Sequence, residues 1–275
     1  MLKFSKMHGL GNDFMVIDAI RQHVTLDSNQ VRRLADRHFG VGFDQLLLVE
    51  RPTGNLADFR YRIFNADGSE VSQCGNGARC FARFVNETGL SDKRRITVET
   101  EAGHLVLELE ENGQITVNMG VPRHNPAEIP LQSTEEQLCY SVPVGGQLWQ
   151  FGAVSMGNPH AVLLVDDVDT APVTSLGPTF ERHSLFPQRA NIGFLQILDP
   201  HHARLRVFER GSGETLACGS GACAAAVVGI EQNLLVDPVR IDLPGGSLDI
   251  RWQGRGQPVF MTGPAVTVFE GMIEI

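Results

Sequence analysis

Apolar and polar residues alternate in several short segments of the chain, most of them bounded by Gly, Pro or Asn. Such alternation places one set of side chains on each face of a half-buried strand. An amphipathic pattern also predicts one helix, capped near Ser28 and stopped at Gly40. The alternating segments predict strands of a mainly antiparallel sheet at residues 94–101, 104–111, 114–120, 203–209 and 258–263.

The period changes from two to that of a helix directly after two cysteine- and glycine-rich segments. Residues 78–89, ARCFARFVNETG, follow CGNG at 74–77, and residues 222–233, ACAAAVVGIEQN, follow CGSG at 218–221. Both runs are apolar and rich in small residues near their start. We therefore expect each helix to begin beside its cysteine and to lie buried inside its own sheet.

The two cysteine segments belong to a longer internal repeat. Residues 64–82 align with residues 208–226 at an offset of 144, and in both copies the cysteine follows the phenylalanine by ten positions. Further matches in the same order occur at an offset of 146, such as Gln45 with Asn191. Collinear matches at a nearly constant offset indicate a duplicated chain. They predict an α/β (α+β) fold of two pseudosymmetric domains.

The domain boundaries follow from where the second copy ends. Prolines within five residues of each other interrupt the strand pattern in residues 121–130, and the strand-like stretch 265–275 comes after the last repeated segment. We expect that stretch to return to the first domain. The predicted domains are therefore residues 1–118 plus 264–275, and residues 119–263.

Composition narrows the class of protein. Lys+Arg 23 against Asp+Glu 32 gives a net charge of -9, which disfavours binding to nucleic acid. No segment has the apolar length of a signal peptide core or a membrane span, so we expect a cytoplasmic protein with no membrane partner. The five cysteines, an odd number, indicate thiols rather than a disulfide framework. The three lysines lie outside glycine-rich segments, so pyridoxal phosphate has no anchor, and no cofactor is expected.

Cys74 and Cys218 suit acid–base chemistry because of where they stand. The start of a helix carries a partial positive charge and unpaired N–H groups, which lower the pKa of a cysteine placed there. Two such helix starts facing each other would bind a carboxylate and place one sulfur on each side of the adjacent carbon. One thiolate would remove the α-proton while the other thiol supplies a proton to the opposite face. Stereoinversion of an amino acid without a cofactor follows.

Other readings of the cysteines are weaker. Cys80, Cys139 and Cys223 lack this context and read as small buried apolar residues. Zinc sites use ligand gaps of two to four residues, which the pair Cys74/Cys80 lacks, and a redox pair would use Cys-x-x-Cys, which is absent. No metal site is therefore expected.

Polar residues recur at matching places in the two copies: Asn12 with Asn158, Gln45 with Asn191, and Asn65 with Glu209. Asparagine in turns is commonly there for backbone geometry, but three ordered pairs suggest a polar cleft for a zwitterionic substrate. His160 and Glu209 are candidates to tune or relay protons to a sulfur, against a core histidine and a solvated carboxylate. Arg210 can bind a second carboxylate, against an ordinary surface arginine.

These motifs together resemble the diaminopimelate epimerase family along nearly the whole chain. They include Asn12-Asp13-Phe14, Gly157-Asn158-Pro159-His160, Glu209-Arg210-Gly211 and the two cysteine segments. The resemblance implies two domains, each a curved sheet around a central helix, and interconversion of LL- and meso-2,6-diaminopimelate for lysine and peptidoglycan, without pyridoxal phosphate or metal. It implies Cys74 as proton donor and Cys218 as acceptor, with His160 and Glu209 setting their protonation.

The resemblance also assigns a binding shell and a dimer. The substrate contacts that it implies are Asn12, Gln45, Asn65, Gly75, Asn76, Asn158, Asn191, Glu209, Arg210, Gly219 and Ser220. The family's dimer contact uses a tyrosine where this chain has Phe269, which keeps the ring and loses the hydroxyl. A homodimer is expected.

Two alternatives stay open at this point. Proline or hydroxyproline racemases use the same paired-thiol logic, but Arg210 with several side-chain amides favours a substrate that has a second amino-acid end. A non-catalytic small-molecule-binding protein or a thiol redox sensor would need only one reactive cysteine. The duplicated pair speaks against that class.

Overall fold

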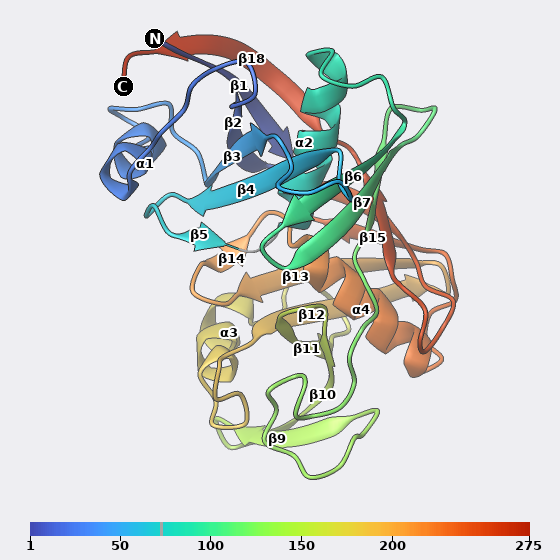
Figure 1. Ribbon diagram of the computed structural model, residues 1–275. Coiled ribbons are helices and arrows are strands. Elements are labelled where there is room, and N and C mark those ends of the chain that lie inside the picture. Colours follow the sequence, from blue (N-terminus) through green and yellow to red (C-terminus); the bar gives the residue numbers. More distant parts are fainter. Residues whose placement is uncertain (72–73) are drawn as a thin grey trace. The chain divides into compact units, whose positions relative to one another are not determined.

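The computed structural model describes residues 1–71 and 74–275 and divides into two compact units (Figure 1). Unit 1 consists of Met1–Asn118 together with Thr262–Ile275, and unit 2 consists of Met119–Met261. Unit 2 is therefore an insertion within the sequence of unit 1. The chain passes between the units twice.

Unit 1 is a mainly antiparallel sheet with two helices. The strands pair in the order β18, β1, β2, β3, β4, β6, β7, β8, and β5 adds to β4. Only the β2–β3 and β4–β6 pairs among these are parallel. The elements are β1 (Leu2–Gly9), β2 (Asn12–Asp18), α1 (Ser28–Ala35), β3 (Gln45–Glu50), β4 (Phe59–Asn65), β5 (Glu70–Val71), α2 (Gly75–Glu87), β6 (Arg95–Thr100), β7 (Gly103–Leu109), β8 (Ile115–Asn118) and β18 (Val266–Ile273).

Unit 2 repeats this plan. Its strands pair in the order β9, β10, β11, β12, β13, β15, β16, with β14 added to β13 and with parallel pairs at β11–β12 and β13–β15. Strand β17 spans the sequence boundary between the units. The elements are β9 (Tyr140–Val144), β10 (Gln147–Ser155), β11 (Pro159–Leu164), α3 (Val173–Glu181), β12 (Asn191–Asp199), β13 (His202–Glu209), β14 (Gly213–Thr215), α4 (Gly219–Glu231), β15 (Val239–Leu243), β16 (Gly246–Arg251) and β17 (Phe260–Gly263).

The register of the parallel strand pairs β2–β3 and β11–β12 matches the internal repeat of the sequence. Phe14 lies opposite Gln45 in the β2–β3 pair, and His160 lies opposite Asn191 in the β11–β12 pair. Both members of the second pair are 146 positions after their counterparts, the offset found in the sequence. The predicted fold class, two pseudosymmetric sheet-dominated units, is confirmed.

Each unit wraps its sheet around one apolar helix. Helix α2 contacts β1, β2, β3, β7 and β8, and α4 contacts β10, β11, β12, β13, β15 and β16. Nearly every residue of α4 from Gly221 to Gly229 is buried, which its alanines permit because their short side chains let strands approach on all sides. The prediction that both helices lie buried inside their sheets is confirmed.

The amphipathic helix α1 differs from its prediction at both ends. Its N-cap is Asp27 rather than Ser28, because the Asp27 carboxylate accepts N–H groups of Asn29 and Gln30 while the Gln30 side chain accepts the Asp27 N–H. The helix ends at Ala35, and Gly40 instead donates its N–H to the carbonyl of Asp36. A capping box therefore overrides the serine.

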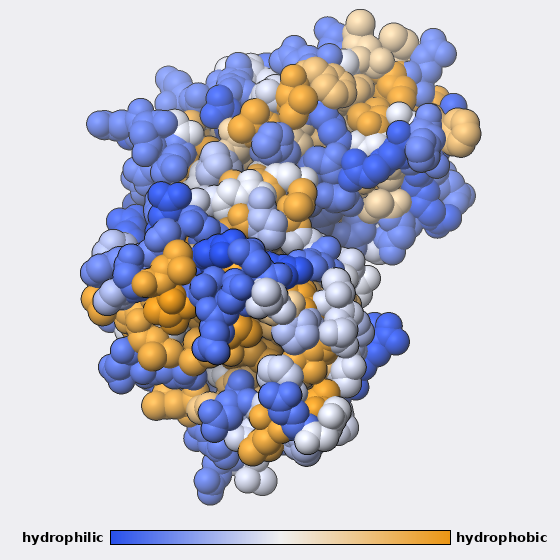
Figure 2. Space-filling view, turned by 180° about the vertical axis from the view of Figure 1, so that it is seen from behind, coloured by the Kyte–Doolittle hydropathy of each residue, from blue (hydrophilic) through white to orange (hydrophobic). Residues whose placement is uncertain are grey.

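Apolar residues remain on the surface, as Figure 2 shows in orange among hydrophilic residues in blue. Scattered exposed apolar side chains such as Leu56 are ordinary. Strand β18 is different, because it exposes Val266, Val268, Phe269 and Met272 within seven residues. None of the described helices is long and apolar enough to cross a membrane.

Candidate active site

Cys74 and Cys218 occupy equivalent places, each as the N-cap of the buried helix of its unit. Both have extended backbones, with φ/ψ of -147°/118° at Cys74 and -116°/104° at Cys218. Their carbonyls accept the first helical hydrogen bonds, from Ala78 N at 2.8 Å and from Ala222 N at 2.9 Å. Each helix thus begins directly after its cysteine, as predicted, and the positive end of the helix dipole lies beside the sulfur.

Close packing fixes the first turn of both helices. A Cβ on Gly77 would lie 2.3 Å from the hydroxyl of Tyr61, which donates to the Cys74 carbonyl at 3.3 Å. A Cβ on Gly221 would lie 3.1 Å from the sulfur of Cys218. Glycine at position 77 is therefore required by a close approach, and at position 221 a Cβ would crowd the sulfur itself.

The Cys74 thiol faces an amide oxygen. Its Sγ lies 3.8 Å from Oδ1 of Asn12, which also accepts a hydrogen bond from Nδ2 of Asn76 at 3.3 Å. The Nδ2 of Asn12 donates to Oδ2 of Asp44 at 2.9 Å. Three predicted site residues of unit 1, Asn12, Cys74 and Asn76, are thereby brought together.

Two further predicted residues of unit 1 form a second polar pair. Gln45 Nε2 donates to Asn65 Oδ1 at 2.9 Å, and Asn65 Nδ2 donates to Ser69 Oγ at 3.1 Å. The other end of the Gln45 amide, Oε1, is buried and has no hydrogen-bond partner among the described residues. A buried acceptor without a partner costs about 1–3 kcal/mol. Such an atom is suited to an N–H group of a ligand.

The Cys218 thiol lies in a different polar setting. Its Sγ is 3.7 Å from Oγ of Ser220, which accepts from Asn158 Nδ2 at 3.3 Å and lies 3.1 Å from His160 Nε2. The same Nε2 lies 3.0 Å from Asn158 Oδ1, which can only accept, so Nε2 carries the proton. Because neither Asn158 Nδ2 nor the protonated Nε2 can accept a hydrogen bond, the Ser220 hydroxyl directs its own proton toward the sulfur.

The pKa of Cys218 moves opposite to the sequence-based expectation. Burial raises it well above the usual value, because the residue is only 4% exposed, and the Glu209 carboxylate beside it raises it further. The Ser220 hydroxyl and the Gly221 N–H act in the other direction and are outweighed. The predicted lowering by the helix start is wrong for Cys218, since desolvation of a thiolate exceeds the dipole's stabilisation here. At neutral pH this sulfur is a thiol.

His160 is a neutral imidazole. Burial, together with a smaller effect of the positive charge of Arg210, lowers its pKa to about 3. It reaches Cys218 through Ser220 and makes no direct contact that would carry a proton to the sulfur. His160, the candidate for relaying a proton, thus lies next to Ser220, the hydrogen-bond partner of the Cys218 thiol.

A pH dependence of stability follows from the buried His160. A histidine in the unfolded chain titrates near pH 6.5, so below that pH the unfolded state binds a proton. In the folded state His160 does not bind this proton until the pH falls to about 3. The stabilisation is fully present above pH 6.5 and is lost as the pH falls. His160→Gln should flatten the dependence of the unfolding free energy between pH 6 and 4 by about 1.4 kcal/mol per pH unit. Urea denaturation measures this; His23→Gln, at an exposed site, is the control, and parallel curves for both variants would contradict it.

Asn191 and Arg210 are joined to each other. Asn191 is buried, donates through Nδ2 to the Pro159 carbonyl at 3.1 Å and accepts the backbone N–H of Arg210 at 3.0 Å. Both ends of the Asn191 side-chain amide therefore already form hydrogen bonds with the backbone. The Arg210 side chain is exposed, and one guanidinium N–H donates to the Gln188 carbonyl at 3.2 Å. Of the two, Arg210 is the one open to a ligand.

The remaining cysteines behave differently from one another. Cys80 and Cys223 are fully buried, and burial raises the pKa of Cys80 to about 12, which agrees with a packing role. Cys139 was expected to be buried and is exposed instead, because it lies in the loop before β9. No cluster of three or more potential metal ligands occurs among the described residues.

The structure adds a charged network that the sequence analysis missed. Asp13 accepts hydrogen bonds from Arg37 at 2.8 and 2.9 Å and from Lys6, and Arg37 also donates to Asp44 at 2.8 Å. These bonds lower the pKa of Asp13 although its burial acts to raise it. Asp13 and Asp44 adjoin the predicted residues Asn12 and Gln45 in sequence, and this adjacency was the available signal.

The full chain shares its fold with solved racemases, epimerases and isomerases. A hydroxyproline epimerase from Agrobacterium vitis with bound trans-4-hydroxy-L-proline superposes with a TM-score of 0.70 at 14% identity, covering 98% of this chain and 91% of that one. A phenazine biosynthesis protein of the PhzF family from Bacillus anthracis gives 0.69 at 18% identity, covering 100% and 99%. The fold therefore places the chain in a structural class that includes racemases and epimerases.

Sequence comparison identifies the family within that class. The family model for diaminopimelate epimerase matches residues 4–125 and 152–268. The diaminopimelate epimerase of Pseudomonas paraeruginosa is 62% identical over 275 residues, covering 100% of both chains, and that of Nitrosospira multiformis is 59% identical over 274 residues, covering 100% of this chain and 99% of that one. The chain belongs to the diaminopimelate epimerase family.

Proposed function

We propose that this protein interconverts LL- and meso-2,6-diaminopimelate by a two-base mechanism, with Cys74 and Cys218 as the acid and base and with no cofactor. The observation that carries the proposal is the pair of equivalent thiols, each capping a buried helix at matching positions of two similar units. Family membership along the whole chain supports the substrate. The predicted halves 1–118 plus 264–275 and 119–263 would each bring one sulfur.

The proposed proton transfers balance when solvent restores the resting state: after product leaves, Glu209 releases its proton to water and Cys74 takes one up. Glu209, which accepts a hydrogen bond from Cys218, takes its proton when substrate binds and leaves a thiolate. The thiolate removes the substrate's α-proton, and Cys74 delivers its own proton to the opposite face of the carbon. The two sulfurs exchange roles in the reverse direction. Helix N–H groups that bind the adjacent carboxylate stabilise the charge that develops on the α-carbon.

Side chains in both units are suited to hold a substrate with two amino-acid ends. In unit 1, the Oε1 of Gln45 is a buried acceptor for an ammonium group. In unit 2, Arg210 is exposed and can pair with the distal carboxylate. The proposed binding shell is completed by Asn12, Asn65, Gly75, Asn76, Asn158, Asn191, Glu209, Gly219 and Ser220.

Deuterium exchange tests the proposal directly. Reduced protein is incubated with LL-diaminopimelate in deuterium oxide without added cofactor, while NMR follows the α-proton and chromatography separates the isomers. Loss of the α-proton signal together with growth of the meso isomer is expected. No exchange with fully reduced thiols would overturn the two-base mechanism, and exchange of proline or hydroxyproline alone would overturn the substrate.

The proposal extends to where the enzyme works. Interconversion of diaminopimelate isomers serves the formation of lysine and peptidoglycan in bacteria. Both thiols must stay reduced, and the cytoplasm keeps thiols reduced through glutathione and thioredoxin. We therefore propose a cytoplasmic enzyme of lysine biosynthesis. Recovery of the native protein in the periplasmic fraction would contradict this.

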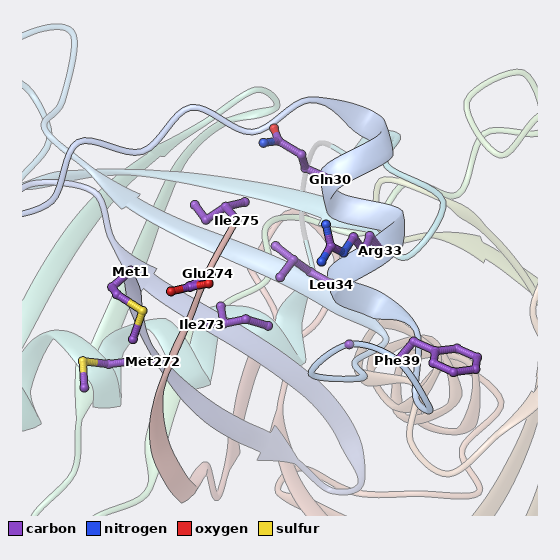
Figure 3. A pocket seen from close by; sticks show the side chains of 10 residues that line it. Met1, Gln30, Arg33, Leu34, Phe39, Met272, Ile273, Glu274 and Ile275 are labelled. Carbon is purple, nitrogen blue, oxygen red and sulfur yellow. The ribbon is translucent and has the colours of Figure 1, made fainter.

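We further propose a homodimer that uses the exposed face of β18. Phe269 is 49% exposed and packs edge-on against Phe4, with ring centroids 6.1 Å apart. The neighbouring surface holds a pocket with α1 on one side, which supplies Gln30, Arg33 and Leu34, and the end of β18 and the residues after it on the other (Figure 3). Apolar side chains gathered on one strand are typical of an interface.

Phe269→Glu should weaken this dimer by about 100-fold, because a carboxylate buried without a partner costs roughly 3 kcal/mol. Analytical ultracentrifugation over a concentration series measures the dissociation constant. Leu56→Glu introduces the same charge at a residue that is 81% exposed in a loop of the same unit and should leave the constant unchanged. A wild-type protein that sediments as a monomer at every concentration would refute the dimer.

A further inference from the structure

A chain of hydrogen bonds runs through unit 1 past the Cys74 thiol, and every donor in it points the same way. Arg79 Nη2 donates to Asn76 Oδ1 at 3.0 Å, and Asn76 Nδ2 donates to Asn12 Oδ1 at 3.3 Å. Asn12 Nδ2 then donates to Asp44 Oδ2 at 2.9 Å. The chain begins at a guanidinium, which only donates, and ends at a carboxylate, which only accepts.

The two charged ends determine how both amides are turned. If the Asn12 amide were flipped, its NH₂ would meet the NH₂ of Asn76, and its oxygen would meet the Asp44 carboxylate. Neither contact forms a hydrogen bond. Arg79 is fully buried and also donates to the Pro264 carbonyl at 3.1 Å, so that end of the chain is fixed within the core.

Asp44 is itself held from two sides. Arg37 Nη2 donates to its Oδ1 at 2.8 Å, and the backbone N–H of Asp13 donates to its Oδ2 at 3.1 Å. Its own backbone N–H donates to Asp13 Oδ1 at 3.0 Å. The carboxylate that receives the Asn12 amide therefore has a fixed position next to the start of β2.

We propose that Asp44 is a positioning residue that turns the Asn12 amide so that its oxygen faces Cys74 and holds this sulfur as a thiol between turnovers. An oxygen acceptor stabilises S–H and not the thiolate. The contrast with unit 2 is direct, because there the Ser220 hydroxyl directs a proton toward Cys218. The inference rests on the proposed function, for which it keeps Cys74 protonated as the acid, while Cys218, also a thiol at rest, has Glu209 beside it to take its proton.

Other titratable and charged groups also surround Cys74. Tyr61 of β4 donates to its carbonyl, Cys80 follows it by less than two turns of α2, and the Arg79 charge acts on both Tyr61 and Cys80. None of these groups turns the Asn12 amide except Arg79, through Asn76. Asp44 is thus the group whose replacement changes the direction of the chain with the least change in packing, since it is 45% exposed.

The test is the pH profile of alkylation of Cys74 by iodoacetamide in the absence of substrate. Cys74 is the only cysteine in the tryptic peptide 63–79, so mass spectrometry quantifies it separately from the other thiols. In Asp44→Asn a single oxygen replaces the two that accept from Arg37, from Asn12 Nδ2 and from the Asp13 N–H, and the carboxylate charge is lost. The Asn12 amide is then held less firmly and can turn its NH₂ toward Cys74. Alkylation at pH 7 should become about tenfold faster, with the profile moved about one pH unit lower and its high-pH plateau unchanged.

Variants separate the relay through Asn12 from a direct effect of charge. Asp44→Asn should change alkylation less than about twofold in an Asn12→Ala background, because the relay is gone. Asn12→Ala alone should speed alkylation, since it removes the acceptor. Asp44→Glu should keep the wild-type profile. Glu70→Gln, which breaks the pairing with Arg62 at 2.7 and 2.8 Å in the same unit, should also keep it.

Three results would overturn the inference: an unchanged profile in Asp44→Asn, an equal change in the Asn12→Ala background, or slower alkylation in Asn12→Ala. A raised plateau without a shifted midpoint would show loosened structure and would also count against it. Because alkylation needs no turnover, these outcomes are independent of the deuterium exchange experiment. Failure of the proposed function is thereby distinguished from failure of the inference.

Discussion

Cys74→Ser and Cys218→Ser should each lower kcat/KM for diaminopimelate by about a thousandfold or more in both directions. Serine keeps the size of the side chain, but its hydroxyl is far less acidic than a thiol and therefore exchanges a proton with the α-carbon much more slowly. Positioned acid–base groups contribute about 10²–10⁴-fold to the rate of a reaction. Because serine also caps helices well, neither variant should unfold more easily. Steady-state rates and deuterium entry at the α-carbon, together with thermal unfolding, give the measurement.

Cys139→Ser is the matched control for this prediction. It makes the same chemical change at an exposed thiol in a loop of unit 2 and should leave kcat/KM within about twofold of wild type. Retention of a tenth of the activity by either cap variant would show that its sulfur is not an essential acid or base. Equal loss in Cys139→Ser would show that the assay reports damage rather than chemistry.

Gly77→Ala should destabilise the protein by about 2 kcal/mol, which is typical for a methyl group forced into a closely packed site. The new Cβ would lie 2.3 Å from the Tyr61 hydroxyl, and Tyr61 is only 2% exposed, so the ring cannot move aside freely. Displacing it breaks the hydrogen bond to the Cys74 carbonyl. Stability and turnover should therefore fall together, as measured by urea denaturation and by the exchange assay.

Gly54→Ala provides the comparison. Nothing lies within 4 Å of a Cβ built on Gly54, which stands in an exposed loop of the same unit, so the change should be neutral within about 0.5 kcal/mol. Gly77→Ala with wild-type stability would mean that the first turn of α2 can shift. The close approach of Tyr61 would then not be what demands glycine at this position.

The repeat in the sequence predicted the fold and the places of both cysteines because it is a pattern in the order of residues along the chain, which the sequence shows directly. The change of period after CGNG and CGSG located the starts of α2 and α4, since a buried helix must begin where the apolar run begins. The expectation that these helices are buried followed from their apolar runs and from the small residues near their start. Local sequence therefore determined the elements that carry the sulfurs.

The electrostatic environment of the two sulfurs could not be predicted in the same way. The rise in the pKa of Cys218 depends on how completely its unit covers it and on Glu209, nine residues earlier on a different element. The network of Lys6, Arg37, Asp13 and Asp44 joins residues up to 38 positions apart through side-chain bonds. Tertiary contacts of this kind leave no periodic trace in the sequence.

The insertion of unit 2 within unit 1 sets an order of assembly during synthesis. Unit 2 is continuous from Met119 to Met261, so all its strands exist before β18 has been made. Unit 1 waits for β18, whose Ile273 pairs with Leu2 at the other end of the chain. Until then β1 presents an open edge to other nascent chains. Unit 1, which holds Cys74, is thus the last to complete its sheet. A ribosome that stalls late releases a chain in which unit 2 is folded and unit 1 is incomplete.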